Sequence, residues 1–489
     1  MASDIYYSTN PADWTQLEGV YISEIPVASQ VEGANMQTVS FAGKCVRGPV
    51  DVCLQVNTPE RFQAVYGGRS VTPAGPLVGE VWKGIIGKPF APIVVRRVAS
   101  SAAVAATFTP GGGAGAVCMV AASSVGAWGN TLVLEIKDAS DGDVNHWNLS
   151  VTSDGKTLLW ENLDITVGNN NLNQVIGDDY ATPIRVTKTA DGRPTNTTTP
   201  KALTGGDDGT IADTDYITGI TDLAYVDGVT VCLIPEAAPT QATVNQAIVQ
   251  LAAQANDRCF FLWSGVHTNT PDQEITAKKA QVLTPGQRVY WFFNSAKVID
   301  PVTGAKVDVA PHTFAASIIS QNFVDVHIGA YETLKQTAGV VGLRNESLRR
   351  ADLIQLRSNG IMAFEKQKRG FRFRSGIATD AKTRLVDRRE RDYLQMSAGE
   401  FLAPFVDETN IVERRAQMTG GIAAFSDDLM TSQRIIEDYR VKLVTTEAQR
   451  AQNMEFILWE VRLIGHLEFI ILMTNIGTGV TIDTGQVAA

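Results

Sequence analysis

The segment VDGVTVCLIPEAAPTQATVNQAIVQLAAQANDRCFFLW, from Val226 to Trp263, carries the pattern of a strand, a helix and a second strand. Its two ends, VDGVTVCLIP and RCFFLW, are short apolar runs that are typical of buried strands. Between them, TQATVNQAIVQLAAQAND has apolar residues at the spacing of a helix. Because RVYWFFN predicts another strand further on, the sequence favours an α/β region that runs to about Leu343.

The same alternation occurs earlier in the chain. MQTVSFAGKCVRGPV predicts a strand that leads into a loop at Gly48-Pro49. TPERFQAVYGG predicts a short helix, which Thr58 caps and Gly67-Gly68 ends. LVGEVWKGIIGK predicts a second helix and APIVVRRV a short apolar strand, so this region is also α/β.

A change in composition separates these two regions. PGGGAG, just after Thr109, opens a stretch rich in Gly, Thr, Asn and Asp that ends near Pro200. Within it, NTLVLEI predicts a strand and HWNLSVTSDGKTLLWENL a hairpin that turns at Asp154-Gly155. We therefore predict a β-rich domain inserted into the α/β region.

The last third of the chain predicts a helix followed by strands. Apolar residues recur every three or four positions in NIVERRAQMTGGIAAFSDDLMTS, which predicts a helix despite its adjacent glycines. RIIEDYRVKLV predicts a strand with Ile435, Tyr439, Val441 and Leu443 on one face. GTGVTIDTGQVAA predicts a weak strand and a loose tail.

The run EFILWEVRLIGHLEFIILMT, residues 455–474, has the length of a membrane span. Its glutamates, arginine and histidine would each cost kilocalories in lipid, so we predict two buried strands and no membrane anchoring. The N-terminus MASDIYYSTN lacks the basic start and apolar run of a signal peptide, which favours folding in a cytoplasm.

Composition indicates a folded, acidic protein of several domains. The chain has 489 residues, a formal net charge of −10 and 44% hydrophobic residues. From Arg344 to Arg391 there are 14 Lys or Arg against 6 Asp or Glu, whereas Ala202 to Asp257 has eight acids and no Lys or Arg. These segments of charge +8 and −8 are either solvated faces or surfaces that bind each other, within one chain or between copies. The five scattered cysteines favour reduced, buried thiols.

Candidate sites for chemistry are weak. KGIIGKPF departs from a phosphate loop, which needs glycine at Trp82 and serine or threonine at Pro89. LTGGDDGT is best read as a turn, and DASDGDVNH lacks the alternation and closing glutamate of an EF-hand. The histidines are isolated and no serine stands in G-x-S-x-G, although distant residues can still meet in the fold. We predict no catalytic residue, no metal and no cofactor.

Basic residues alternate with Phe371 and Phe373 between Lys366 and Arg374. This pattern fits either a nucleic-acid surface or a half-buried strand with a charged outer face. The acidity of the whole chain favours the strand, so no nucleic-acid partner is predicted.

Several phrases resemble those of contractile tail sheath proteins of bacteriophages and related injection machines. GVYISEIP resembles the opening strand of that family, and VSFAGKCVRGPVDVCLQVNTPERFQAVYGG resembles its G-x-A-x-R-G-P segment and following helix, with Cys45 and Tyr66 as departures. GAWGNTLVLEI resembles its W-G-N segment, and LTGGDDGT with DYITGITDL its L-x-G-G-x-D-G segment. RDYLQMSAGEFLAPFVDETN and the closing strands resemble its C-terminal domain in layout.

This resemblance implies a multidomain α/β plus β protein with a subtilisin-like α/β core, an inserted β-rich domain and a C-terminal α+β domain. A subtilisin-like topology does not imply protease activity, because a shared fold does not carry a shared function. The corresponding boundaries are an arm at 1–26, core segments at 27–107 and 201–352, an insertion at 108–200 and a C-terminal domain at 353–489.

The resemblance also implies that copies exchange strands. We expect the N-terminal arm, through Val20, Tyr21 and Ile22, to add to a neighbour's sheet. The receiving sheet is predicted at residues 435–443 and 455–474, and the second exchanged piece at 480–482. The expected exchange residues of these segments are Ile435, Tyr439, Val441, Val461, Leu463, Val480 and Ile482, and the linker at 28–35 is expected to flex.

The implied function is that of a sheath subunit, not an enzyme, which polymerises as a helix around a tail tube and contracts to drive the tube through a host envelope. Expected partners are further copies, the tail tube protein, the baseplate and the tail terminator or neck proteins. The expected location is the virion tail, after assembly in the host cytoplasm. Two alternatives stay open, a static tail or capsid protein and an α/β hydrolase with a pocket and a base.

Overall fold

The computed structural model describes residues 31–67, 92–111, 117–153, 155–164, 179–255, 257–281, 283–299, 304–330, 333, 337, 339–432 and 434–466, and the backbone of 5–7 and 20–22. By its internal contacts the chain divides into two units. We call Gly33–Ser397 the core unit, and Met1–Glu32 together with Ala398–Ala489 the terminal unit.

An eight-stranded sheet lies at the centre of the core unit, in the order β20-β19-β15-β14-β13-β3-β5-β4. Every pair between β5 and β19 is parallel, whereas β4 and β20 pair antiparallel at the two edges. The strand–helix–strand prediction for residues 226–263 is thereby confirmed. The strands are β3 (Val39–Gly43), β4 (Leu54–Val56), β5 (Ile93–Arg97), β13 (Val231–Leu233), β14 (Cys259–Leu262), β15 (Val289–Phe293), β19 (Ile361–Gln367) and β20 (Gly370–Arg374).

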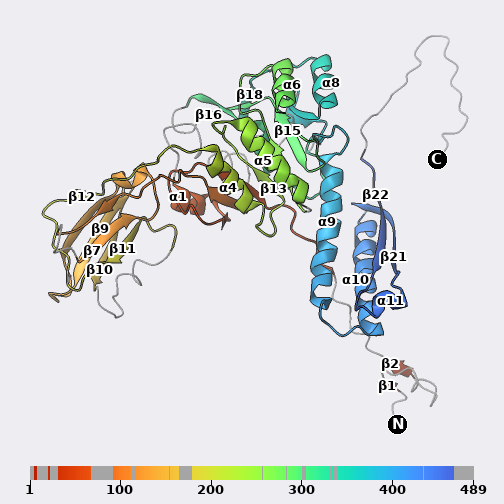
Figure 1. The fold of residues 1–489 in the computed structure, drawn as a ribbon, viewed down its shortest axis with the longest axis horizontal. Helices are drawn as coiled ribbons and strands as arrows, with labels where there is room; N and C mark the ends of the chain where they lie inside the picture. Colours follow the sequence, from red (N-terminus) through yellow and green to blue (C-terminus); the bar gives the residue numbers. More distant parts are fainter. Residues whose placement is uncertain are drawn as a thin grey trace, which may run out of the picture. The chain divides into compact units, whose positions relative to one another are not determined.

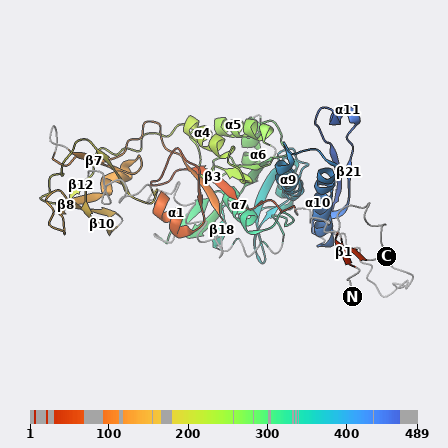
Figure 2. The same cartoon turned by 90° about the horizontal axis from the view of Figure 1, so that it is seen from below.

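Two apolar layers cover the two faces of this sheet, because alternate residues of each strand point to opposite sides. Phe261 and Phe292 belong to one layer, and Phe260 and Trp291 belong to the other. Figure 2 shows the helices α4, α5 and α6 on one side of the sheet and α1 and α7 on the other. The first layer contains α1 (Pro59–Tyr66), α7 (Pro311–Gln321) and a small sheet of β16 (Ala296–Ile299), β17 (Lys306–Val309) and β18 (Val340–Leu343); the second contains α4 (Asp213–Leu223), α5 (Gln241–Gln254), α6 (Pro271–Ala280) and α8 (Arg350–Ser358).

The helix predicted in TPERFQAVYGG is confirmed as α1. The Thr58 side chain accepts a hydrogen bond from the backbone N–H of Arg61, and Gly67 follows the last turn with a positive φ of 85°. The second helix predicted nearby, at residues 77–88, lies outside the described part of the chain.

The β-rich region forms two sheets around one core, and it lies at one end of the core unit (Figure 1). The predicted hairpin is confirmed, since Ser153 of one strand pairs with Lys156 of the next. Trp147 and Leu149 are completely buried between the sheets. One sheet has β8 (Val133–Asp138), β9 (Trp147–Ser153), β10 (Lys156–Leu163) and β12 (Lys201–Ala202), and the other has β6 (Thr107–Phe108), β7 (Cys118–Ala122) and β11 (Ile184–Lys188).

Arg97, at the end of β5, ties the β-rich region to the central sheet. Its guanidinium donates to the carbonyl oxygens of Gly48 and Val125, each at 2.9 Å, and its side chain is buried. A backbone bridge between Val104 and Asp207 brings the two connecting segments together. The LTGGDDGT segment thus lies beside the chain that enters the β-rich region.

The terminal unit has a helix, α10 (Val412–Thr431), and a hairpin of β21 (Ile436–Leu443) and β22 (Ile457–Leu463) with α11 (Glu447–Arg450) between the strands. It also contains β1 (Ile5–Tyr7) and β2 (Val20–Ile22), and the end of α9 (Leu385–Leu402), which starts in the core unit. The helix predicted across Gly420-Gly421 is confirmed as α10. Glycine is required at 421 because a Cβ there would lie 2.2 Å from Cζ of Phe401.

Candidate functional site

The hairpin β21–β22 is the candidate site for joining copies. Its strands pair antiparallel, with Tyr439 opposite Val461 and Val441 opposite Trp459. Figure 1 shows the hairpin lying beside α10. Of the predicted exchange residues, this fold brings together Tyr439, Val441, Val461 and Leu463, and buried Ile435 directly precedes β21.

The face of the hairpin toward α10 is held by polar as well as apolar contacts. Trp459 donates its indole N–H to Ser426 Oγ at 3.0 Å, and its ring lies 6.5 Å from that of Phe425. Tyr439 donates its hydroxyl to Asp427 at 2.6 Å. The sequence analysis missed Trp459, Ser426 and Asp427 as site residues. The available signal was the position of Trp459 two residues before Val461, which places both on one face of a strand.

The opposite face of the hairpin is charged. Arg440 of β21 pairs with Glu460 of β22, and Arg462 lies 3.0 Å from Glu437. These pairs are exposed, so they contribute little to stability and this face of the hairpin is in contact with solvent. The prediction that residues 455–474 form two buried strands is wrong for the first strand. β22 alternates between half-buried and exposed residues after Trp459, because α10 covers only one face of the hairpin; residues after 466 lie outside the described part.

Both outer edges of this hairpin are open among the described residues, since the sheet has two strands, each with one partner. An edge strand presents unpaired N–H and C=O groups that can pair with another chain. A two-stranded sheet is also marginal by itself and gains stability from further strands. The geometry therefore offers two places for strand addition.

Apolar side chains extend the hairpin at its tip. Val444 and Phe456 are 44% and 43% exposed, and Met454 is 39% exposed. Beside them, Glu455 is held ionised: desolvation opposes this, but hydrogen bonds from Thr445, Asn410 and Arg450 outweigh it and lower its pKa to about 2. The tip therefore combines a hydrogen-bonded carboxylate with exposed apolar side chains.

The N-terminal exchange residues form β2, which pairs in parallel with β1 of the same chain. Val20 lies opposite Ile5, and Ile22 opposite Tyr7. The structure contains one copy, so the addition of this strand to a neighbour stays a prediction. Val480 and Ile482 lie outside the described residues.

The end of the central sheet where α/β proteins bind ligands is occupied by Glu236. From β3 the chain proceeds to β5 on one side and later to β13 on the other, and ligands bind at the carboxyl ends of strands beside such a switch point. Here Glu236 Oε1 accepts the Lys44 backbone N–H at 2.6 Å and the Tyr216 hydroxyl at 3.1 Å. Burial raises the pKa of Glu236 to about 7, against these hydrogen bonds. The sequence analysis did not identify this group.

One serine–histidine pair assembles from residues distant in the sequence. Nδ1 of His267 lies 2.8 Å from Oγ of Ser295, at the carboxyl ends of β14 and β15. Ser295 is only 3% exposed and the His267 ring lies 4.8 Å from that of Trp263, so the pair is packed into the structure. Burial lowers the pKa of His267 from its usual value, which favours the neutral form of its ring.

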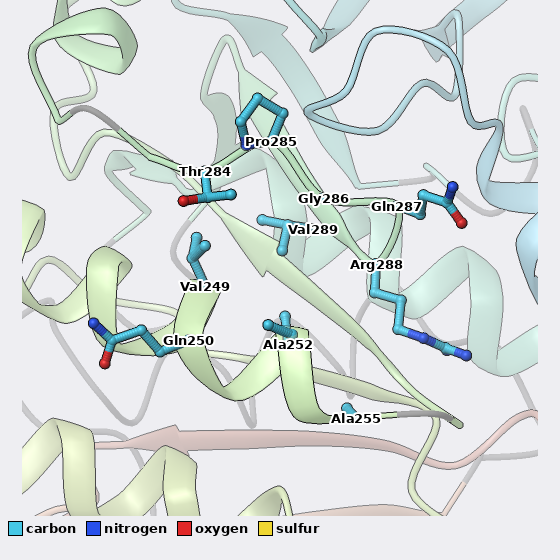
Figure 3. A pocket seen from close by; sticks show the side chains of 11 residues that line it. Val249, Gln250, Ala252, Ala255, Thr284, Pro285, Gly286, Gln287, Arg288 and Val289 are labelled. Atoms are coloured by element: carbon cyan, nitrogen blue, oxygen red, sulfur yellow. The ribbon is translucent and has the colours of Figure 1, made fainter.

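A hollow of about 460 Å³ lies elsewhere, between the last turns of α5 and the segment before β15. Figure 3 shows Val249, Ala252 and Val289 around it, with the Arg288 side chain directed away. Arg288 is paired with Asp392 at 2.6 Å. The described residues that line the hollow include no histidine, cysteine or carboxylate. Among these described residues, the hollow offers no histidine, cysteine or carboxylate that could activate the Thr284 hydroxyl.

Solved structures with a similar fold include sheath proteins. The sheath tail protein of Desulfitobacterium hafniense matches with a TM-score of 0.60 and 15% identity, over 91% of this chain and 100% of its own. The sheath tail protein of Listeria innocua matches with a TM-score of 0.60 and 11% identity, over 89% of this chain and 97% of its own. The helical sheath of the anti-feeding prophage in its contracted state matches with a TM-score of 0.55 and 12% identity, over 94% of this chain and 99% of its own. The chain has the fold of a tail sheath protein. No family profile and no curated protein matches the sequence.

Within this sheath fold, seven basic residues of the basic segment form ion pairs inside the chain. Arg372 and Arg374 of β20 both pair with Glu365 of β19, which confirms the half-buried strand predicted there. Five further residues, Arg344, Arg349, Lys366, Arg384 and Arg388, pair with Asp308, Asp352, Glu346, Asp387 and Asp392. The acidic segment also forms ion pairs inside the chain, for example between Asp222 and Arg96. Of the acids paired with the basic segment, only Asp308 and Asp392 lie outside it, so most of its net charge of +8 is not cancelled by these pairs.

Among the helices of the described residues, none has the length and hydropathy needed to cross a bilayer. The five cysteines are free thiols, of which Cys118, Cys232 and Cys259 are buried and Cys45 and Cys53 are partly buried.

Proposed function

We propose that this protein is the structural subunit of a contractile tail sheath. It polymerises as a helix around a tail tube and contracts to drive the tube through a host envelope. The likeness to sheath proteins over nine-tenths of the chain supports the fold of such a subunit. The observation that carries the function is the β21–β22 hairpin, both edges of which are open within the described part of the chain. An open edge on each side gives every copy two acceptor positions.

The proposed linkage uses one added strand at each edge. Residues 1–26 supply the arm through Val20–Ile22, and a strand at residues 480–482 supplies the second piece. Main-chain hydrogen bonds give affinity, and alternate side chains give register. Because donor and acceptor surfaces differ, the contact is heterologous and generates an open helix.

The proposed organisation follows from this linkage. Segments 27–107 and 201–352 form a subtilisin-like core body, 108–200 an inserted domain and 353–489 the C-terminal domain. During contraction the bodies rotate and slide as rigid units while the exchanged strands stay paired. The tail tube, the baseplate and a terminator or neck protein are the proposed partners, and the virion tail the proposed location.

A truncation and a peptide test the linkage. The chain without residues 1–26 should remain a folded, soluble monomer, whereas the full chain should form hollow tubes in electron micrographs. The peptide EGVYISEIP should bind the truncated chain and change the fluorescence of the half-buried Trp459; a peptide with Val20 and Ile22 replaced by serine is the control. Tubes formed by the truncated chain would contradict the proposal.

The two alternatives give other outcomes. A static tail or capsid protein should show one helical geometry, whereas a sheath should show a long and a short form. A hydrolase acting through Ser295 and His267 should lose activity on a substrate panel in Ser295→Ala. The burial of Ser295 disfavours this alternative.

A further inference from the structure

The polar segment before β3 is fixed along α9 within the core unit. The Ser397 hydroxyl accepts the Ala34 backbone N–H at 2.9 Å, and Arg389 donates to the Met36 carbonyl at 3.1 Å. Thr230 donates to the same carbonyl at 3.1 Å. Ala34 and Met36 are only 6% and 3% exposed. This segment, residues 33–36, is therefore an ordered strap.

The strap uses one face of α9. Arg389, Tyr393 and Ser397 are spaced by four residues, so they lie one above the other along the helix. Residue 34 contacts the later end of this row and residue 36 the earlier end. The strap therefore runs antiparallel to α9. The N-terminal end of the strap therefore lies beside Ser397, near the C-terminal end of α9.

Gly33 fits closely against this row. A Cβ at residue 33 would lie 2.2 Å from the Tyr393 hydroxyl oxygen and 3.0 Å from its Cζ. Tyr393 is 5% exposed and its ring contacts Phe323 edge-on at 5.1 Å, so the ring has little room to move. The Ser397 hydroxyl is in turn fixed by donating to the Tyr393 carbonyl at 2.7 Å.

We propose that residues 33–36 are the fixed anchor of the N-terminal arm, with Gly33, Arg389, Tyr393 and Ser397 as its positioning residues. This inference rests on the proposed function, in which the arm is donated to a neighbour. A pull on the arm passes through the strap to α9, which leads directly to the hairpin-bearing part of the chain. Thr230, directly before β13, bonds to the same strap, so the central sheet shares this load with α9. The prediction that the linker at 28–35 flexes is wrong for residues 33–35, which belong to the strap, and residues 28–30 lie outside the described part of the chain.

Three variants test the anchor. Ser397→Ala removes the acceptor for the Ala34 N–H, and Ser397→Thr restores a hydroxyl. Ser320→Ala is the matched control, because Ser320 is equally buried on a helix and bonds only to the Ser317 carbonyl. Hydrogen exchange of the monomer should be about tenfold faster at Ala34 in Ser397→Ala, the factor expected for one lost hydrogen bond, and unchanged in β13 and in the control.

Tube stability supplies the second readout. Tubes of Ser397→Ala should dissociate at lower urea than those of the wild type, Ser397→Thr and Ser320→Ala, while the monomer's own unfolding midpoint changes little. Unchanged exchange at Ala34 would overturn the anchor. Faster exchange with fully stable tubes would overturn its role in the load path. If the wild-type chain forms no tubes, the proposed function fails, and the exchange experiment still decides whether the strap is anchored.

Discussion

Trp459 of β22 donates its indole N–H to Ser426 Oγ of α10 across 3.0 Å, and this bond joins the candidate acceptor hairpin to the helix beneath it. Ser426 also donates to the Ile422 carbonyl at 2.8 Å, so the acceptor is itself held in position. A hairpin with open edges can accept a strand in register only if it is fixed in this way.

Trp459→Phe should loosen the hairpin without unfolding α10. It removes one hydrogen bond between partly buried groups, at a cost of about 1 kcal/mol. Hydrogen exchange should accelerate in β21 and β22, and tube formation should require a higher protein concentration. Tyr439→Phe is the control, because it removes a more exposed bond to Asp427 and should have the smaller effect.

The two adjacent glycines of α10 should respond in opposite directions to alanine. Gly421→Ala places a methyl group against the Phe401 ring and should destabilise the terminal unit by about 1–3 kcal/mol. A Cβ at Gly420 meets no heavy atom within 4 Å, so Gly420→Ala should stabilise the helix by up to about 1 kcal/mol. Thermal denaturation of both variants measures the difference, and equal effects would show that Phe401 does not pack on residue 421.

Glu236 should make the core unit less stable as the pH rises. Its pKa is raised by burial to about 7, against an unperturbed 4.5, so the folded state holds a proton that the unfolded state releases. The stability gained from this proton is full below pH 4.5 and is lost as the pH passes 7, on the order of 3 kcal/mol in total.

Glu236→Gln tests this pH dependence, because it keeps an oxygen for the Lys44 N–H and the Tyr216 hydroxyl but does not titrate. Buried His312, with its pKa lowered to about 4, acts in the opposite direction in both proteins. Between pH 5 and pH 8 the denaturant midpoint of the wild type, followed by hydrogen exchange in β3 and β13, should therefore fall relative to that of the variant. Identical slopes in the two proteins would exclude Glu236 as the titrating group.

Arg97→Lys should loosen the β-rich region from the central sheet. A lysine ammonium cannot reproduce the planar fork that reaches the Gly48 and Val125 carbonyls together, so one buried acceptor loses its donor at a cost of about 1–3 kcal/mol. Protease cleavage should increase at residues 98–104 and 207–211. Arg61→Lys is the control, since the bond of Arg61 to Asp179 is exposed and contributes little.

Several elements were predictable because their signals are local. The continuous apolar runs of β14 and β15 reflect a sheet buried on both faces. Thr58 and Gly67 mark the ends of α1 through their own backbone geometry. The wrong prediction of two buried strands at 455–474 has a clear cause. Apolar content indicates a strand, but burial depends on how many neighbours cover it, and β22 has one strand and one helix.

The sequence by itself determined the α/β pattern, the inserted β-rich region, the helix of residues 412–431 and the strand that follows it, because hydrophobic period and turn residues act within a few positions. Only the tertiary structure decided that Ser397 holds Ala34, that Glu236 occupies the end of the sheet between β3 and β13, and that Ser426 receives Trp459. These contacts join residues 33 to 363 positions apart, and their energy depends on burial and on a geometry that no local pattern records.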